Sequence, residues 1–287
     1  MNQAENSAAN TPNSTEYPVE ISIQSLMKAG AHFGHQTDKW NPQMSKYIYA
    51  ERSGLHIINL DLTLDAWKRA RKAILNVTST GGSVLFVGTK RQAREVIEEE
   101  SKRSNSFFVT NRWLGGTLTN FSTIKKSIDR IKKLTELLEK ANDAESEVRL
   151  NKKEQLKITR DLEKLEASLG GIKDLKGLPG ALFVTDINRE SIAIEEAKKL
   201  HIPVIALADT NSNPGVVDYA IPSNDDGVRT LRIFSAAVAD AAIEGATIFK
   251  ERFESAKETK TQEASESKKK PKAEVKETAS EEAAPAA

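Results

Sequence analysis

The chain has 287 residues, of which 38% are hydrophobic and 29% are charged, enough to bury a core in one large domain or two small ones. Lysine and arginine (42) nearly balance aspartate and glutamate (41), so a nucleic-acid surface requires local segregation of charge. The absence of cysteine excludes disulfides and thiolate metal sites. The sequence contains neither an apolar run of about 20 residues nor a signal-peptide pattern, so we expect a cytoplasmic protein without membrane association.

Both ends of the chain are expected to be disordered. Residues 1–17 and 257–287 carry almost no large apolar side chains, so they cannot offset the entropy lost on ordering. The basic run 268–272 is a candidate RNA contact, but a solvated tail of mixed charge is the better interpretation.

Between the ends, strand and helix signals alternate in chain order. Residues 47–60 predict a β-hairpin, and Thr63 looks like the N-cap of a helix that ends at Gly81 and Gly82. The remaining expected elements are strands at 83–87, 107–109, 181–184, 203–207 and 219–221, and helices at 90–103, 188–200 and 225–251. This alternation predicts an α/β fold with a doubly wound, flavodoxin-like parallel sheet, built from residues 18–120 and 171–256.

Residues 121–170 interrupt the alternation and contain no strand signal. Apolar residues step at intervals of three and four from Ile124 to Leu138 and again from Ile158 to Leu169. Asn151 and Glu154 resemble a capping box at the start of the second helix. The segment therefore predicts a helical hairpin, packed as an antiparallel coiled coil, that projects from the sheet domain.

Two loops are candidate phosphate-binding sites. After the strand at 83–87, Lys90 and Arg91 enter the first turn of a helix, where cations are disfavoured unless an anion binds there. The spacing is not that of a P-loop, and a surface turn with solvated cations is the simpler alternative. The loop 111–120 combines arginine, tryptophan, glycines and polar donors that suit phosphate and ribose. Alternatively, Trp113 fills the core and the glycines form a turn, and both readings can hold together.

The first arm of the hairpin carries Lys125, Lys126 and Arg130 with few acids nearby. Such a helix face is usually only solvated. Next to the two loops, it would extend one continuous phosphate-binding surface.

A metal site is a further hypothesis. Asp209, Asp225 and Asp226 follow expected parallel strands, whose carboxyl ends share one edge of the sheet. Together with His35 from the loop at 28–42, these carboxylates would suit Zn²⁺ or Mg²⁺. The competing interpretation is that Asp225 or Asp226 caps the final helix.

Seven segments, in order and at matching spacing, resemble the bacterial ribosomal protein S-two family of the small subunit. They are 28–42 (KAGAHFGHQTDKWNP), 56–61 (HIINLD), 86–91 (FVGTKR), 112–120 (RWLGGTLTN), 162–173 (LEKLEASLGGIK), 178–184 (LPGALFV) and 209–214 (DTNSNP). The resemblance runs from about Val19 to Gly245 and supports the metal hypothesis, because relatives have a similar His and Asp cluster. The tail after Lys257 departs from shorter members, and no function is transferred to it.

The resemblance implies a non-enzymatic scaffold at the junction of the head and body of the small subunit. Its partners would be ribosomal RNA and neighbouring proteins, including the large multi-OB-fold protein that captures messenger RNA, and we expect no homo-oligomer. The expected RNA-binding residues are Lys39, Lys90, Arg91, Arg94, Arg112, Thr117, Asn120, Lys125, Lys126 and Arg130.

Two other functions are consistent with parts of the sequence. A metal-dependent hydrolase or nucleotide-binding enzyme would suit carboxylates on a doubly wound sheet, but the sequence displays no substrate pocket, poised base or nucleophile elbow. A purely protein-binding coiled-coil adaptor would leave the basic loops unexplained.

Overall fold

The computed structural model describes residues 21–142 and 150–267. Its main sheet has five parallel strands in the order β5-β4-β6-β7-β8, which is the flavodoxin-like order, so the predicted doubly wound fold is confirmed. The strands are β4 (Val84–Val87), β5 (Phe107–Val109), β6 (Ala181–Val184), β7 (Val204–Ala208) and β8 (Tyr219–Pro222).

The sheet is buried on both faces, which explains why its strands are continuous apolar runs. Phe86 and Phe183 point to one face and meet edge to face, with ring centroids 5.5 Å apart. Their neighbours Val87 and Val184 point to the other face. Helices α2 (Leu60–Thr78), α3 (Arg91–Arg103) and α7 (Val228–Ser267) pack together on the first face, and α6 (Ser191–Lys199) and the root of the helical hairpin cover the second.

The start of α2 differs from the sequence prediction. Asn59, not Thr63, is the N-cap, because the Asn59 side chain accepts a hydrogen bond from the Asp61 N–H at 3.0 Å. Thr63 lies inside the helix, where its hydroxyl donates to the Pro222 carbonyl at 2.6 Å. The hydroxyl therefore ties α2 to the end of β8.

A small antiparallel sheet precedes α2 and has the strand order β1-β3-β2. The predicted hairpin of β2 (Ile48–Arg52) and β3 (Leu55–Ile58) is confirmed. Helix α1 (Ile23–Ala29), strand β1 (Phe33–Gln36) and the 3₁₀ turn η1 (Pro42–Tyr47) were not expected. A Cβ on Gly34 would lie 2.5 Å from the Thr210 side chain, so this glycine lets β1 approach the end of β7 and brings His35 to the sheet edge.

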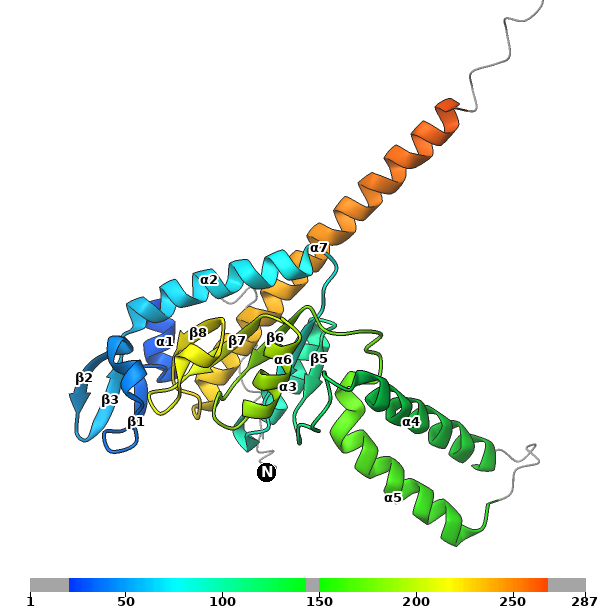
Figure 1. Ribbon diagram of the computed structural model, residues 1–287, viewed down its shortest axis with the longest axis horizontal. Coiled ribbons are helices and arrows are strands. Elements are labelled where there is room, and N and C mark those ends of the chain that lie inside the picture. The colour runs from blue at the N-terminus through cyan, green and yellow to red at the C-terminus, as the bar shows by residue number, and fades with distance from the viewer. Residues whose placement is uncertain (1–20, 143–149, 268–287) are drawn as a thin grey trace, which may run out of the picture.

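The expected helical hairpin is formed by α4 (Phe121–Asn142) and α5 (Lys152–Leu169), which lie side by side and project from the sheet domain (Figure 1). As predicted, Glu154 accepts a hydrogen bond from the Asn151 N–H, at 3.1 Å. The root of the hairpin is part of the sheet domain and does not simply project from it, because Ile128, Ile131 and Leu169 belong to the core under the sheet. Coiled-coil packing further out stays a prediction.

Two 3₁₀ turns complete the described elements, η2 (Gly170–Ile172) after α5 and η3 (Pro214–Val216) before β8.

The last helix corrects the predicted boundary of the tail. Helix α7 begins at Val228 and continues to Ser267, so residues 257–267, expected to be disordered, are helical. Lysine, glutamate, glutamine and alanine have high helix propensity, and a helix already started in the core propagates more easily than it nucleates. In Figure 1 its distal part extends beyond the sheet domain, past the end of α2. The predictions for 1–17 and 268–287 lie outside the described residues.

Candidate functional site

The carboxyl ends of the five parallel strands meet along one edge of the sheet, which we call the rim. Lys90, after β4, lies at its centre with only 14% of its side chain exposed. Its ammonium lies 2.9 Å from Asp186 and 2.8 Å from both Asp225 and Asp226. Three carboxylates of the same chain thus hold the charge of Lys90, which favours an internal role, and its contact with RNA stays a prediction.

The ionisation of this cluster reflects its burial. Desolvation, together with the carboxylates of Asp209 and Asp186, raises the pKa of Asp225 to about 7, although the charge of Lys90 opposes the shift. Burial alone would lower the pKa of Lys90, but the attraction of Asp225, Asp226 and Asp186 raises it overall. The ammonium thus stays charged and balances the buried acids.

Next to this cluster, three of the four predicted metal ligands come together. Donor atoms of His35, Asp209 and Asp225 lie within 4.8 Å of one another. His35 Nδ1 is 3.1 Å from Asp209 Oδ2, and a hydrogen bond to this carboxylate raises the pKa of His35 against the effect of burial. Asp226 lies at the margin, half exposed, with its Oδ2 3.6 Å from His35 Nε2.

The donor set fits a divalent cation. Asp225 is 1% exposed, and the partner of its Oδ1 in the structure is the Lys90 ammonium at 2.8 Å. One imidazole and two carboxylates are ligand types that Zn²⁺ accepts. The turn before α7 is bonded by Asn224, not by Asp225 or Asp226: the Asn224 side chain accepts from the N–H groups of Asp226 and Gly227, at 2.9 and 2.6 Å.

The loop after β4, expected to hold a phosphate, is instead bound by a carboxylate of the protein. Glu190 Oε1 accepts from the N–H and the hydroxyl of Thr89, at 2.8 and 2.6 Å. Arg189 Nε donates to the same hydroxyl at 2.7 Å. The strand order reverses between β4 and β6, where doubly wound proteins commonly bind ligands. Here side chains of the chain itself occupy that position.

The loop 111–120 is organised around a second internal carboxylate, Glu196 on α6. Its two oxygens accept five hydrogen bonds of 2.7–3.1 Å, from the Trp113 indole, the N–H groups of Gly116, Leu118 and Thr119, and the Thr119 hydroxyl. Burial would raise the pKa of Glu196, but these donors, led by the Thr119 N–H, lower it overall. We call this arrangement the Glu196 clamp.

The clamp bears on two predictions for the loop. Trp113 is 7% exposed and belongs to the core, as the alternative interpretation proposed. Thr117 is 2% exposed and its hydroxyl donates to the Leu114 carbonyl at 2.5 Å, which favours a role in the loop itself, and its contact with RNA stays a prediction.

The other expected RNA-binding residues remain accessible. Those with exposed side chains are Lys39, Arg91, Arg112, Asn120, Lys125, Lys126 and Arg130. None of these cations forms an ion pair with another residue in the described ranges 21–142 and 150–267. Arg94 is half-buried, and its Nε faces the Thr89 carbonyl at 3.4 Å. Among the predicted RNA-binding residues, Lys90 and Thr117 are thus buried and bonded within the chain, and the outer cations are exposed; the continuous surface stays a prediction.

Sequence reasoning missed Asp186, Glu190 and Glu196. Asp186 follows β6 as Asp209 follows β7, so the strand-end rule that selected Asp209 would have found it. Glu190 and Glu196 had no signal of this kind, because their partners lie 101 and 77–83 residues away in the sequence.

These observations describe a doubly wound α/β protein whose rim is filled from within and whose free cations lie on its outer loops and hairpin. The family described as Ribosomal protein S2 matches residues 26–245, and the chain belongs to that family. It is similar to the small ribosomal subunit protein uS2 of Sorangium cellulosum (strain So ce56), with 49% identity over 235 residues, 82% of each chain. It is also 47% identical to the protein of the same name from Nitratidesulfovibrio vulgaris (strain DP4), over 86% of this chain and 96% of the relative.

The family and relatives are named as ribosomal proteins, so the chain is a structural ribosomal protein and not an enzyme. Among the described residues, no helix combines the length and apolarity needed to cross a membrane.

Proposed function

We propose that this protein is a constituent of the cytoplasmic small ribosomal subunit, where it binds ribosomal RNA and neighbouring proteins at the junction of head and body. The observation that carries the proposal is the division of its positive charge. Lys90 is neutralised inside the rim, whereas Arg112, Lys126 and Arg130 are exposed and have no ion-pair partner among the described residues. Exposed cations without an ion-pair partner favour binding of a polyanion such as RNA, because neutralising its phosphates releases their condensed counterions.

Co-sedimentation tests this proposal. The full chain should sediment with small subunits, and raising the salt concentration should release it. Replacing Arg112 and Lys126 by glutamine should weaken binding, while the matched change of Arg69 and Lys72, two exposed cations on α2, should have little effect. Protein that stays free of subunits at every salt concentration would overturn the proposal.

The proposed partners include neighbouring ribosomal proteins and the large multi-OB-fold protein that captures messenger RNA. The family resemblance implies this partner, and exposed apolar side chains on α1 and β1 supply a suitable surface, with Met27 55% and Phe33 45% exposed. Binding of the purified OB-fold protein should weaken in a Met27→Ser, Phe33→Ser variant and persist in a Leu178→Ser control. Equal binding of the OB-fold protein by the wild type, the double variant and the control would exclude this surface.

We also propose that His35, Asp209 and Asp225 hold a divalent cation, Zn²⁺ or Mg²⁺, with Asp226 beside it. The ion would connect β1 to the ends of β7 and β8, a structural role. The ammonium of Lys90 competes for the same carboxylates. Metal analysis of the purified protein after dialysis should find about one ion per chain, lost in His35→Ala and Asp209→Asn but retained in the control His201→Ala. Unchanged metal content in both ligand variants would refute the site.

A further inference from the structure

The outer face of α5 carries a row of cations that the sequence analysis did not single out. Lys153, Lys157, Arg160 and Lys164 follow one another at intervals of four, three and four residues. At 3.6 residues per turn these positions fall within an arc of about 60°. All four side chains are exposed, and none forms an ion pair within residues 21–142 and 150–267. We call this row the α5 stripe.

Acidic residues flank the α5 stripe and do not lie within it. At 3.6 residues per turn Asp161 lies about 70° from its centre, and Glu154 and Glu163 lie about 90° from it. Leu169, on the opposite side of the helix, belongs to the core. A helix that needed only solubility would interleave both signs. Cations spaced about 5–6 Å apart over three helical turns match a repeating polyanion better than a single acidic side chain.

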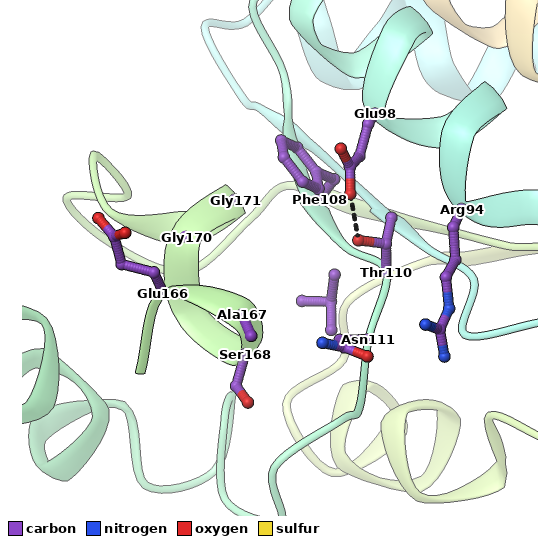
Figure 2. A pocket seen from close by; sticks show the side chains of 11 residues that line it. Arg94, Glu98, Phe108, Thr110, Asn111, Glu166, Ala167, Ser168, Gly170 and Gly171 are labelled. Atoms are coloured by element: carbon purple, nitrogen blue, oxygen red, sulfur yellow. Dashed lines mark hydrogen bonds between the residues drawn. The ribbon is translucent and has the colours of Figure 1, made fainter. Parts of the chain in front are cut away.

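The stripe leads to a pocket at the root of the hairpin. Ser168, one turn beyond Lys164, lines a cavity of about 280 Å³ between α3, the end of β5 and the end of α5. Figure 2 shows Arg94 on one wall and Ser168 on the opposite wall, with Asn111 between them. Gly170 also lines the cavity, and a Cβ there would meet nothing within 4 Å.

The pocket offers one cation, Arg94, beside two acids that have partners of their own. Glu166 pairs with Lys173, and Glu98 accepts from the Thr110 hydroxyl at 2.9 Å and lies 4.0 Å from the Lys102 ammonium. The terminal amino groups of Arg94 have no partner among the described residues. An arginine with a free planar fork is suited to bidentate contact with phosphate.

We propose that a strand of small-subunit ribosomal RNA lies along the α5 stripe, with its phosphates on the four cations, and that a nucleotide of that strand enters the root pocket beside Arg94. This inference rests on the proposed function and adds a particular surface to it. It adds α5 to the loops, α3 and α4, which the sequence had already indicated, and it gives Arg94 a position beside a pocket.

The test compares matched variants of the full chain for binding to purified small-subunit ribosomal RNA and to small subunits stripped of this protein. Lys157→Gln with Arg160→Gln removes two stripe charges, Arg94→Gln removes the pocket charge, and Arg69→Gln with Lys72→Gln is the control on α2. The slope of log affinity against log salt should become shallower by about two for the stripe variant and about one for the pocket variant. The control should keep the wild-type slope.

Position is tested separately, using the absence of cysteine from the chain. An iron chelate tethered at Ala167→Cys, exposed at the pocket, should cleave a confined stretch of ribosomal RNA in reconstituted subunits. The same chelate at Asn76→Cys on α2 should not cleave that stretch.

The outcomes separate this inference from the proposed function. Wild-type binding with unchanged slopes in both variants would overturn the stripe and pocket while leaving the proposed function intact. Weaker binding to subunits with unchanged binding to purified RNA would assign the stripe to an acidic protein and equally overturn the inference. If the wild-type chain bound neither RNA nor subunits, the proposed function itself would fail.

Discussion

The rim of the sheet and the helical hairpin use charge in opposite ways. At the rim, Lys90 contacts three carboxylates, and Glu190 and Glu196 are surrounded by hydrogen-bond donors of neighbouring loops. On the hairpin, exposed cations such as Lys126 and Lys157 have no described partner. The same residue types therefore hold the fold together in one region and remain available to an external ligand in the other.

This contrast explains how a fold common among nucleotide-binding enzymes can serve a scaffold. The strand-order reversal between β4 and β6 is where such a fold would bind a ligand. In this protein Thr89, Glu190 and Asp186 bond to one another or to Lys90 at that place. In the proposed function, RNA recognition therefore lies outside that place, on elements attached to the sheet.

The largest expected difference in stability between the two regions comes from removing one cation from each. Lys90→Met should lower the free energy of unfolding by about 3 kcal/mol, because it leaves buried carboxylates unpaired. Lys126→Met should change it by less than about 0.5 kcal/mol, since Lys126 is exposed. Urea denaturation at neutral pH measures both values. A similar cost for the two variants would contradict the division between regions.

The Glu196 clamp gives the next largest effect. Glu196→Gln keeps the shape of the side chain but turns one acceptor into a donor that faces the N–H groups of Leu118 and Thr119 or of Gly116. We expect a loss of about 2 kcal/mol in stability by the same measurement. The control is Glu195→Gln, one residue away and exposed. Equal stability of the two variants would mean that the clamp contributes little.

Two adjacent glycines at the hairpin root, Gly170 and Gly171, compare an open position with a tightly packed one. A Cβ at Gly171 would lie 2.2 Å from the Phe108 carbonyl oxygen, a contact that β5 must move to relieve. Gly171→Ala should therefore cost about 1–3 kcal/mol. Gly170→Ala should be neutral or stabilising by up to about 1 kcal/mol, because Gly170 is helical and has open space around it. Thermal unfolding of both variants tests which substitution is the more destabilising. Destabilisation by Gly170→Ala alone would be inconsistent with this packing.

The smallest effect concerns pH. Because the pKa of Glu196 is lowered in the folded protein, its contribution to stability is present above its unfolded pKa and is lost as pH falls through the folded pKa. Wild-type protein should thus lose more stability on acidification below about pH 4.3 than Glu196→Gln, which has no carboxylate to protonate. Parallel urea titrations across this range measure the difference. Curves that stay a constant distance apart would argue against the shift.

The sheet could be predicted from the sequence because its strands, such as Val84–Val87, are short and continuously apolar. The sequence predicted the hairpin because Ile124, Ile128 and Ile131 keep a helical period. It did not predict β1, whose four residues FGHQ carry no alternating pattern, or the extent of α7, whose charged end resembles a disordered segment.

For the site, local patterns gave the residue types but not their partners. The rule that parallel strands end on one edge selected Asp209 and Asp225, and His35 was added from the loop at 28–42; the structure brings the three together. Lys90 was assigned to RNA because its helix position suggested an anion, and the anions proved to be Asp225, Asp226 and Asp186 of the same chain. Which acid neutralises which cation depends on contacts distant in sequence, and no single-sequence pattern encodes them.

The clamp also has a consequence for the order of events during synthesis. Gly116 lies in the loop that carries α4, and the Glu196 carboxylate that accepts from its N–H is synthesised 80 residues later. At bacterial elongation rates of about 5–20 residues per second, roughly 4–16 s separate the two. During that interval the hairpin of α4 and α5 is synthesised before Glu196 is available to bind the loop. The loop can therefore adopt its folded position only after α6 has been synthesised.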